Sequence, residues 1–261
     1  MLNTCIQIAR EAGQLILELS EKPRHIEKKA AFDLVTDADK ASNDLICRRL
    51  MEAFPTSKIL AEESTSPQPS PLNGEGVLWI VDPIDGTTNY ARGMPHAAVS
   101  IGAYDLASQE LLVGCVFNPF INECFWAAKG EGAYLNGERI HVSTINQLSD
   151  AVVATGFFNT GDLTFETSNL PEAYRFIQSC LGLRRAGAAS LDLCWVAMGR
   201  LDMYWEKGLK AWDLAAGALI VQEAGGKLSN YQDEKLDIFQ GTVLASNGHL
   251  HKTSIDILNN Q

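Results

Sequence analysis

The sequence lacks long apolar runs and paired cysteine motifs, and these absences exclude several classes of protein. No apolar stretch approaches the ~20 residues that a membrane-spanning helix needs. The N-terminus has no basic start followed by an apolar segment, so a signal peptide is not expected. None of the six cysteines forms a Cys-x-x-Cys pair, and most have apolar neighbours. We therefore expect reduced core cysteines in a cytoplasmic protein.

Basic residues are scarce relative to acidic ones, 21 against 32, which gives a formal net charge of -11. Such a charge repels phosphate backbones and anionic lipid surfaces, so neither nucleic acid nor membrane is an expected partner. It would also repel a phosphate ester unless bound divalent cations reverse the local charge. The acidic surplus is thus compatible with a metal-loaded site for anions, although solubility alone also explains it.

The organisation of the chain predicts a mixed α and β protein. Its 261 residues suffice for one large domain, which we expect to consist of two closely packed halves, about 1–147 and 148–261. Periodicity predicts helices over residues 3–20, after Thr36, and near 171–181, 191–199 and 213–224. It predicts strands over 58–61, 77–81, 97–104, 110–117, 123–128 and 151–155, and a hairpin around 136–137. The proline-containing segment 64–76 is predicted to be a surface loop.

Residues 82–89 (DPIDGTTN) carry the most chemical information. The continuous apolar run 77–81 predicts a strand buried on both faces and ending at Asp82. Asp85 follows three residues later, across a proline that stiffens the turn. The two carboxylates and the Ile84 carbonyl are the oxygen ligands that Mg²⁺ prefers. The plainer interpretation is an Asp-Gly turn, and the strand before it with the doubled acid favours the metal site.

Three further features are individually ambiguous. Gly86 and Thr87 are expected to open a helix, whose free N–H groups can receive a phosphate. Glu62 ends the predicted strand 58–61, where an acidic residue is usually just solvated. Asp213 begins an apolar helix, where aspartate is usually a cap.

Taken together, the segments resemble the inositol monophosphatase family. The matching segments, in the family's order, are EES at 62–64, WIVDPIDGTTNY at 79–90 and WDLAAG at 212–217, supported by DLVTDAD at 33–39, GAA at 187–189 and YWE at 204–206. The resemblance covers nearly the whole chain. It implies a layered α/β/α/β/α sandwich, a homodimer, and a Mg²⁺-dependent, lithium-sensitive phosphatase acting on a small phosphorylated substrate.

The resemblance also implies roles for individual residues. Two Mg²⁺ ions, bridged by Asp82, and a weaker third near Glu62 would be held by Glu62, Asp82, the Ile84 carbonyl, Asp85 and Asp213. The catalytic residues that orient and help activate the attacking water would be Asp39, Glu62 and Thr87. The substrate would contact Asp85, Gly86, Thr87, Gly187, Ala188, Ala189, Glu206 and Asp213.

The expected reaction is hydrolysis of inositol 1-phosphate by metal-activated water, with alternatives left open. Thr88 argues against relatives that act on histidinol phosphate or nucleotide 3′-phosphates, which more often carry a basic residue there. Ala188 stands where some relatives carry threonine, which leaves the exact substrate open. Fructose-1,6-bisphosphatase activity is a second enzymatic alternative. A non-enzymatic alternative is a protein-binding partner that uses the phosphatase fold, although no implied metal ligand is missing.

Overall fold

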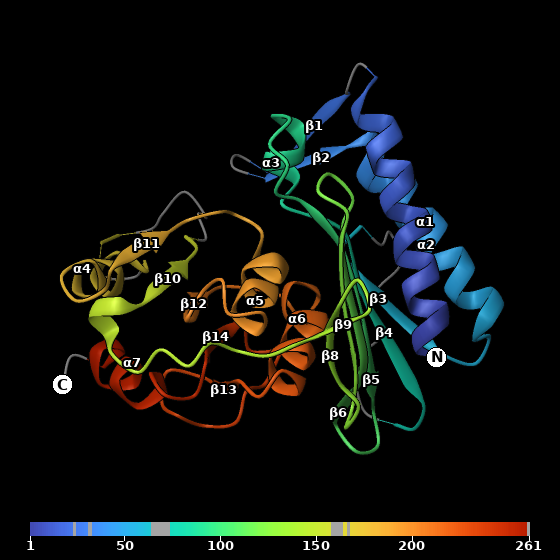
Figure 1. Cartoon of the computed structure of the whole chain (residues 1–261). Coiled ribbons are helices and arrows are strands. Elements are labelled where there is room, and N and C mark those ends of the chain that lie inside the picture. The colour runs from blue at the N-terminus through green and yellow to red at the C-terminus, as the bar shows by residue number, and fades with distance from the viewer. Residues whose placement is uncertain (23–24, 31–32, 64–73, 158–163, 166–167, 260–261) are drawn as a thin grey trace.

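The computed structural model describes residues 1–22, 25–30, 33–63, 74–157, 164–165 and 168–259. Its elements form five layers in the order helix, sheet, helix, sheet, helix (Figure 1). The predicted α/β/α/β/α sandwich is therefore confirmed. Most of the predicted loop 64–76 lies outside the described residues.

The first two layers are a helix pair and a seven-stranded sheet. The helices α1 (Leu2–Ser20) and α2 (Asp37–Ala53) cover one face of the sheet (Figure 1). The strands lie in chain order: β3 (Lys58–Ala61), β4 (Val77–Asp85), β5 (Ala98–Asp105), β6 (Glu110–Asn118), β7 (Glu123–Ala128), β8 (Gly132–Leu135) and β9 (Glu138–Ile140). Only β3 and β4 are parallel, so the carboxyl ends of these two strands meet at one edge. A separate hairpin, β1 (Ile26–Ala30) and β2 (Asp33–Thr36), precedes α2.

The end of β4 differs from the prediction, because the strand does not stop at Asp82. It continues through Pro83 to Asp85, and its register against β5 shifts between these two aspartates. Pro83 has no N–H to donate to the ladder, which favours a bulge at this position. Side chains alternate along a regular strand, so residues three apart would face opposite sides. One extra residue in β4 reverses this alternation, which allows Asp82 and Asp85 to serve the same site.

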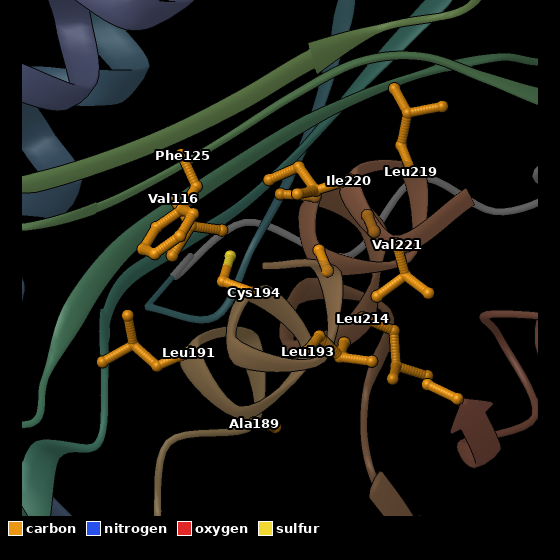
Figure 2. Close-up of a cluster of buried hydrophobic side chains, with 14 of the residues drawn as sticks. Val116, Phe125, Ala189, Leu191, Leu193, Cys194, Leu214, Leu219, Ile220 and Val221 are labelled. Atoms are coloured by element: carbon orange, nitrogen blue, oxygen red, sulfur yellow. The ribbon is translucent and has the colours of Figure 1, made fainter. Parts of the chain in front are cut away.

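The middle layer is a pair of apolar helices between the sheets. These are α5 (Ala189–Ala197) and α6 (Ala211–Glu223), and a short helix, α3 (Thr87–Ala91), follows β4. Figure 2 shows Cys194 of α5 beside Val116 and Phe125 of the large sheet. The approach of α6 to β6 requires a glycine, since a Cβ added to Gly114 would lie 2.7 Å from the Ala216 carbonyl oxygen. This close packing holds the first turn of α6 near the end of β4.

The last two layers are a five-stranded sheet and its outer helices. The strand order is β11 (Gly182–Arg184), β10 (Val152–Thr155), β12 (Met203–Lys207), β14 (Thr242–Ser246) and β13 (Lys227–Ser229). The outer face is covered by α4 (Leu170–Ile177) and α7 (His251–Leu258), while a 3-10 turn, η1 (Leu148–Asp150), precedes β10. Side chains of β12 alternate between layers: Trp205 packs outward on Phe176 of α4, and Tyr204 faces the middle layer.

The predicted helices and strands are all present, with ends shifted by a few residues. All six cysteines are free, and four of them are buried, as the sequence predicted. Within the described ranges, no helix has the length and apolar character needed to cross a membrane.

Candidate active site

An acidic cluster lies where the end of β4 meets the start of α6. Asp82, Asp85 and Asp213 each offer a carboxylate oxygen, and these oxygens all lie within 4.8 Å of one another. Glu62 follows β3, and its backbone N–H donates to the Val81 carbonyl at 3.1 Å. This bond places Glu62 next to Asp82, across the parallel pair of strands. The structure therefore brings together acidic residues that lie far apart in the sequence.

Hydrogen bonds orient each aspartate of the cluster. Asp82 Oδ1 accepts from the Ile84 N–H at 3.0 Å, and Asp213 Oδ2 accepts from the Lys210 N–H at 2.6 Å. Asp85 Oδ2 accepts from both the backbone N–H and the hydroxyl of Ser190, at 2.7 and 2.5 Å. Ser190 is the second residue of α5, and the resemblance assigned it no role. The sequence feature that could have indicated it is its position directly after the GAA segment, at the start of a helix, where serine commonly makes hydrogen bonds.

The carboxylates in this cluster repel one another. Burial, followed by the charges of Glu62, Asp85 and Asp213, raises the pKa of Asp82 well above its usual range. Burial and the charge of Asp85 likewise raise the pKa of Asp213. No lysine or arginine of the described residues forms an ion pair with the three aspartates of the cluster. Two buried carboxylates and the half-buried Asp213 converge on one point, and carboxylates that repel each other in this way are the donor set of a hard divalent cation.

Asp39 and Thr87 form a second polar group beside the cluster. Asp39 is a fully buried residue of the first turn of α2, where its Oδ2 accepts from the backbone N–H and the hydroxyl of Thr36 at 2.8 and 2.5 Å. The hydroxyl of Thr87, the first residue of α3, lies 3.0 Å from Asp39 Oδ1 and 3.0 Å from the Ile84 carbonyl oxygen. A carbonyl oxygen has two lone pairs, so this contact leaves the Ile84 carbonyl able to bind a further group.

The segment predicted to bind phosphate, Gly86 and Thr87, lies against the segment predicted to bind the alcohol, residues 187–189 (the second loop). Gly86 has a φ of +88°, and a Cβ there would lie 3.2 Å from Ala188 Cβ and 3.3 Å from the Gly187 carbonyl oxygen. The Asn89 side-chain amide donates to the Ala186 carbonyl at 2.9 Å and thereby ties α3 to the second loop. Asn89 lies in the quoted motif, but its bridging contact is long-range and has no local sequence signal.

Glu206 completes the set of predicted residues. It lies on β12, is only 9% exposed, and burial raises its pKa to about 7. Its charge contributes to the raised pKa of Asp213, so its carboxylate is electrostatically coupled to the acidic cluster. The opposing influences on the Glu206 pKa are a hydrogen bond from Tyr204 and the charge of Arg185.

Known proteins are similar to this chain over its whole length. Residues 1–261 match the sequence profile described as the inositol monophosphatase family. The chain belongs to this family. It is 40% identical over 260 residues to inositol monophosphatase 2 of Solanum lycopersicum, covering 99% of this chain and 97% of that protein. It is 42% identical over 252 residues to the protein named Nus factor SuhB of Pseudomonas aeruginosa, covering 95% and 91% of the two chains.

A solved inositol monophosphatase also has this fold. The structure from Anabaena (Nostoc) sp. superposes with a TM-score of 0.88 at 36% identity, covering 99% of this chain and 95% of that one. The predicted family and fold are thereby confirmed. As a member of the inositol monophosphatase family, the chain is a phosphoric monoester hydrolase of a metal-dependent type, and its acidic cluster fits a metal ion.

Proposed function

We propose that the protein hydrolyses inositol 1-phosphate to inositol and phosphate with Mg²⁺ as cofactor. The observation that carries this proposal is the convergence of Asp82, Asp85 and Asp213 beside Glu62, within 4.8 Å for the three aspartates. These carboxylates and the Ile84 carbonyl would hold two Mg²⁺ ions, and a third would lie near Glu62. We also propose a cytoplasmic location, which the free cysteines support. The chain would form a single domain, because both sheets pack on the same middle layer of helices.

Magnesium bound here would lower the pKa of a bound water and neutralise charge on the phosphate. The residues of the chain supply the remaining requirements. The Thr87 hydroxyl donates to Asp39, so the Thr87 oxygen can accept a hydrogen bond from the attacking water; as that water loses its proton to Thr87, the proton of Thr87 would pass to the Asp39 carboxylate. Gly86 offers its backbone to the phosphate oxygens; its φ of +88° and the His96 carbonyl oxygen, 2.9 Å from where a Cβ would be, disfavour any side chain here. Together these groups orient the nucleophile in line with the scissile bond.

The alcohol part of the substrate would lie between the second loop and β12. Ala188 and Ala189 are buried, and Gly187 has a φ of +87°, so this loop presents backbone groups and small side chains. Glu206 supplies the carboxylate that accepts from a substrate hydroxyl. A polyol phosphate meets these requirements, because it carries several hydroxyl donors next to the ester.

The test is a substrate panel. Phosphate release is measured from inositol 1-phosphate, fructose 1,6-bisphosphate, histidinol phosphate and adenosine 3′,5′-bisphosphate, each with Mg²⁺ and with a chelator. We expect a Mg²⁺-dependent preference for inositol 1-phosphate. A clear preference for another ester would reassign the substrate and retain the metal site, whereas no release from any of the four would refute the proposal.

Lithium is expected to inhibit at millimolar concentration. A small monovalent cation in the acidic cluster would replace one Mg²⁺ without supplying the charge that the phosphate requires. The measurement is the rate of inositol 1-phosphate hydrolysis in lithium chloride, with sodium chloride at equal ionic strength as the control. Full activity in lithium would contradict the expectation.

The homodimer is proposed to form through α4. Leu170, Tyr174, Ile177 and Leu181 are 45–68% exposed and recur at spacings of four, three and four residues. Leu170, Tyr174 and Ile177 lie on one side of α4, and Leu181 follows four residues after the end of the helix. An exposed apolar stripe of this kind typically marks a protein interface.

Replacing Ile177 with glutamate is expected to produce monomers, because the interface would then bury an unpaired charge. Gln178→Glu is the matched control, since residue 178 is exposed and this change adds the same negative charge next to the apolar stripe. The molar mass in solution, measured by light scattering, distinguishes the two states. A dimeric Ile177→Glu variant would show that α4 does not form the interface.

A second candidate function is a protein-binding role. The relative named Nus factor SuhB carries a name that describes no phosphatase activity. An Asp82→Asn variant tests this alternative in cells from which the wild-type gene has been deleted. Restoration of the cellular phenotype by this inactive variant would favour binding, and failure to restore it would favour catalysis.

A further inference from the structure

The carboxylate of Glu206 lies over Gly156 of the neighbouring strand, in the space that a side chain at residue 156 would otherwise fill. Strand β10 is parallel to β12, and Thr155 pairs with Trp205. The next residues along the two strands, Gly156 and Glu206, are therefore opposite each other and share a face of the sheet. A Cβ added to Gly156 would lie 1.9 Å from Glu206 Oε2, far inside any allowed contact. The φ of Gly156 is not in the left-handed region, so an added Cβ is opposed by this carboxylate, which would have to move to admit it.

Two hydrogen bonds complete this arrangement. The hydroxyl of Tyr204, two residues earlier and on the same face of β12, donates to Glu206 Oε2 at 2.5 Å. Tyr204 is fully buried. On the other side, the Asn169 side-chain amide donates to the Gly156 carbonyl at 2.6 Å and fixes the backbone against which the carboxylate lies. Glu206 Oε2 thus accepts from Tyr204 and lies over the Gly156 backbone, while Oε1 accepts no hydrogen bond from the described residues.

We infer that Gly156 and Tyr204 are positioning residues that determine substrate specificity through Glu206. This inference rests on the proposed function, in which Glu206 accepts from a hydroxyl of a polyol phosphate. A glutamate side chain has three rotatable bonds, and immobilising it in advance lowers the entropic cost of binding the substrate. The space left by Gly156 and the bond from Tyr204 select one orientation of the carboxylate. The same orientation would give no advantage for an ester whose alcohol part has no hydroxyl groups.

The first test compares two substrates in the variants Gly156→Ala and Tyr204→Phe. Gly156→Ala should displace the carboxylate and raise the KM for inositol 1-phosphate about tenfold, the expected loss of one oriented hydrogen bond. The kcat for this substrate should change much less than KM. The ratio of kcat/KM for inositol 1-phosphate to that for 4-nitrophenyl phosphate should fall by a similar factor. Tyr204→Phe should act in the same direction, with a smaller effect.

A double-variant cycle separates positioning from general loss of structure. In a Glu206→Ala background, Gly156→Ala should have no further effect on the substrate ratio, because the carboxylate it displaces is gone. Gly182→Ala is the matched control: Gly182 lies on β11 of the same sheet, and a Cβ there meets only the flexible end of Arg184 at 3.0 Å. This control should retain wild-type kinetics.

Three outcomes would count against the inference. Equal losses on both substrates in Gly156→Ala would mean that the glycine serves only the fold. An undiminished effect of Gly156→Ala in the Glu206→Ala background would mean that it does not act through Glu206. A wild-type protein that hydrolyses 4-nitrophenyl phosphate but not inositol 1-phosphate would instead overturn the proposed substrate, and this inference with it.

Discussion

Replacing Asp213 with asparagine is expected to lower kcat about a hundredfold or more, with little effect on folding. Asp213 has two roles that the variant separates. Its Oδ2 accepts the Lys210 N–H in the first turn of α6, and an asparagine oxygen can accept the same bond. Its charge belongs to the acidic cluster, and a neutral amide cannot replace this contribution to a divalent cation.

The measurements are steady-state kinetics at saturating Mg²⁺ and the midpoint of thermal unfolding. Asp150→Asn is the matched control: it makes the same change in the 3-10 turn η1, where Asp150 is exposed and outside the cluster. A near-normal kcat in Asp213→Asn would show that Asp213 is only a helix cap. A strongly lowered midpoint together with a lowered kcat would show that the structural role dominates.

Removal of metal by a chelator is expected to abolish turnover and to lower the stability of the wild-type protein. In the proposed function Mg²⁺ would bind only the folded state, so adding it should raise the midpoint of thermal unfolding. The gain should be smaller in Asp82→Asn, which lacks the carboxylate at the centre of the cluster. In the absence of metal, Asp82→Asn should be more stable than wild type at neutral pH, because it removes one of the repelling charges. In a chain of this size, each kcal/mol of change in the free energy of unfolding shifts the midpoint of thermal unfolding by about 2–4 °C.

The pH dependence of the metal-free protein follows from the same repulsion. The pKa of Asp82 in the folded protein lies above its ordinary value, so the folded state binds the proton more readily than the unfolded state. The free energy of unfolding therefore decreases as the pH rises above the ordinary value of about 3.9. The loss in the free energy of unfolding is complete once the pH exceeds the raised pKa. Denaturant titrations between pH 5 and 8 should show a weaker decrease in Asp82→Asn, and equal slopes would contradict this explanation.

Much of the fold could be predicted from local sequence patterns. The apolar positions of α1 recur at helical spacing because one side of the helix packs on the sheet. The continuous apolar run before Asp82 indicates a strand buried on both faces, and β4 lies between two helical layers. These patterns are local, since each is set by the side that a single element buries. The bulge at Pro83 was missed, because a register shift depends on the partner strand.

The sequence by itself determined the family, the candidate metal ligands and the order of the elements. Its acidic residues could be assigned to one site only through resemblance, because Glu62, Asp82 and Asp213 have no local pattern in common. The tertiary structure decided which groups meet: Ser190 on Asp85, Asn89 on the loop before α5, and the Glu206 carboxylate over Gly156. Each of these contacts joins residues between about 50 and 105 positions apart. Such contacts form only when packed layers bring separate elements together, and no local periodicity encodes them.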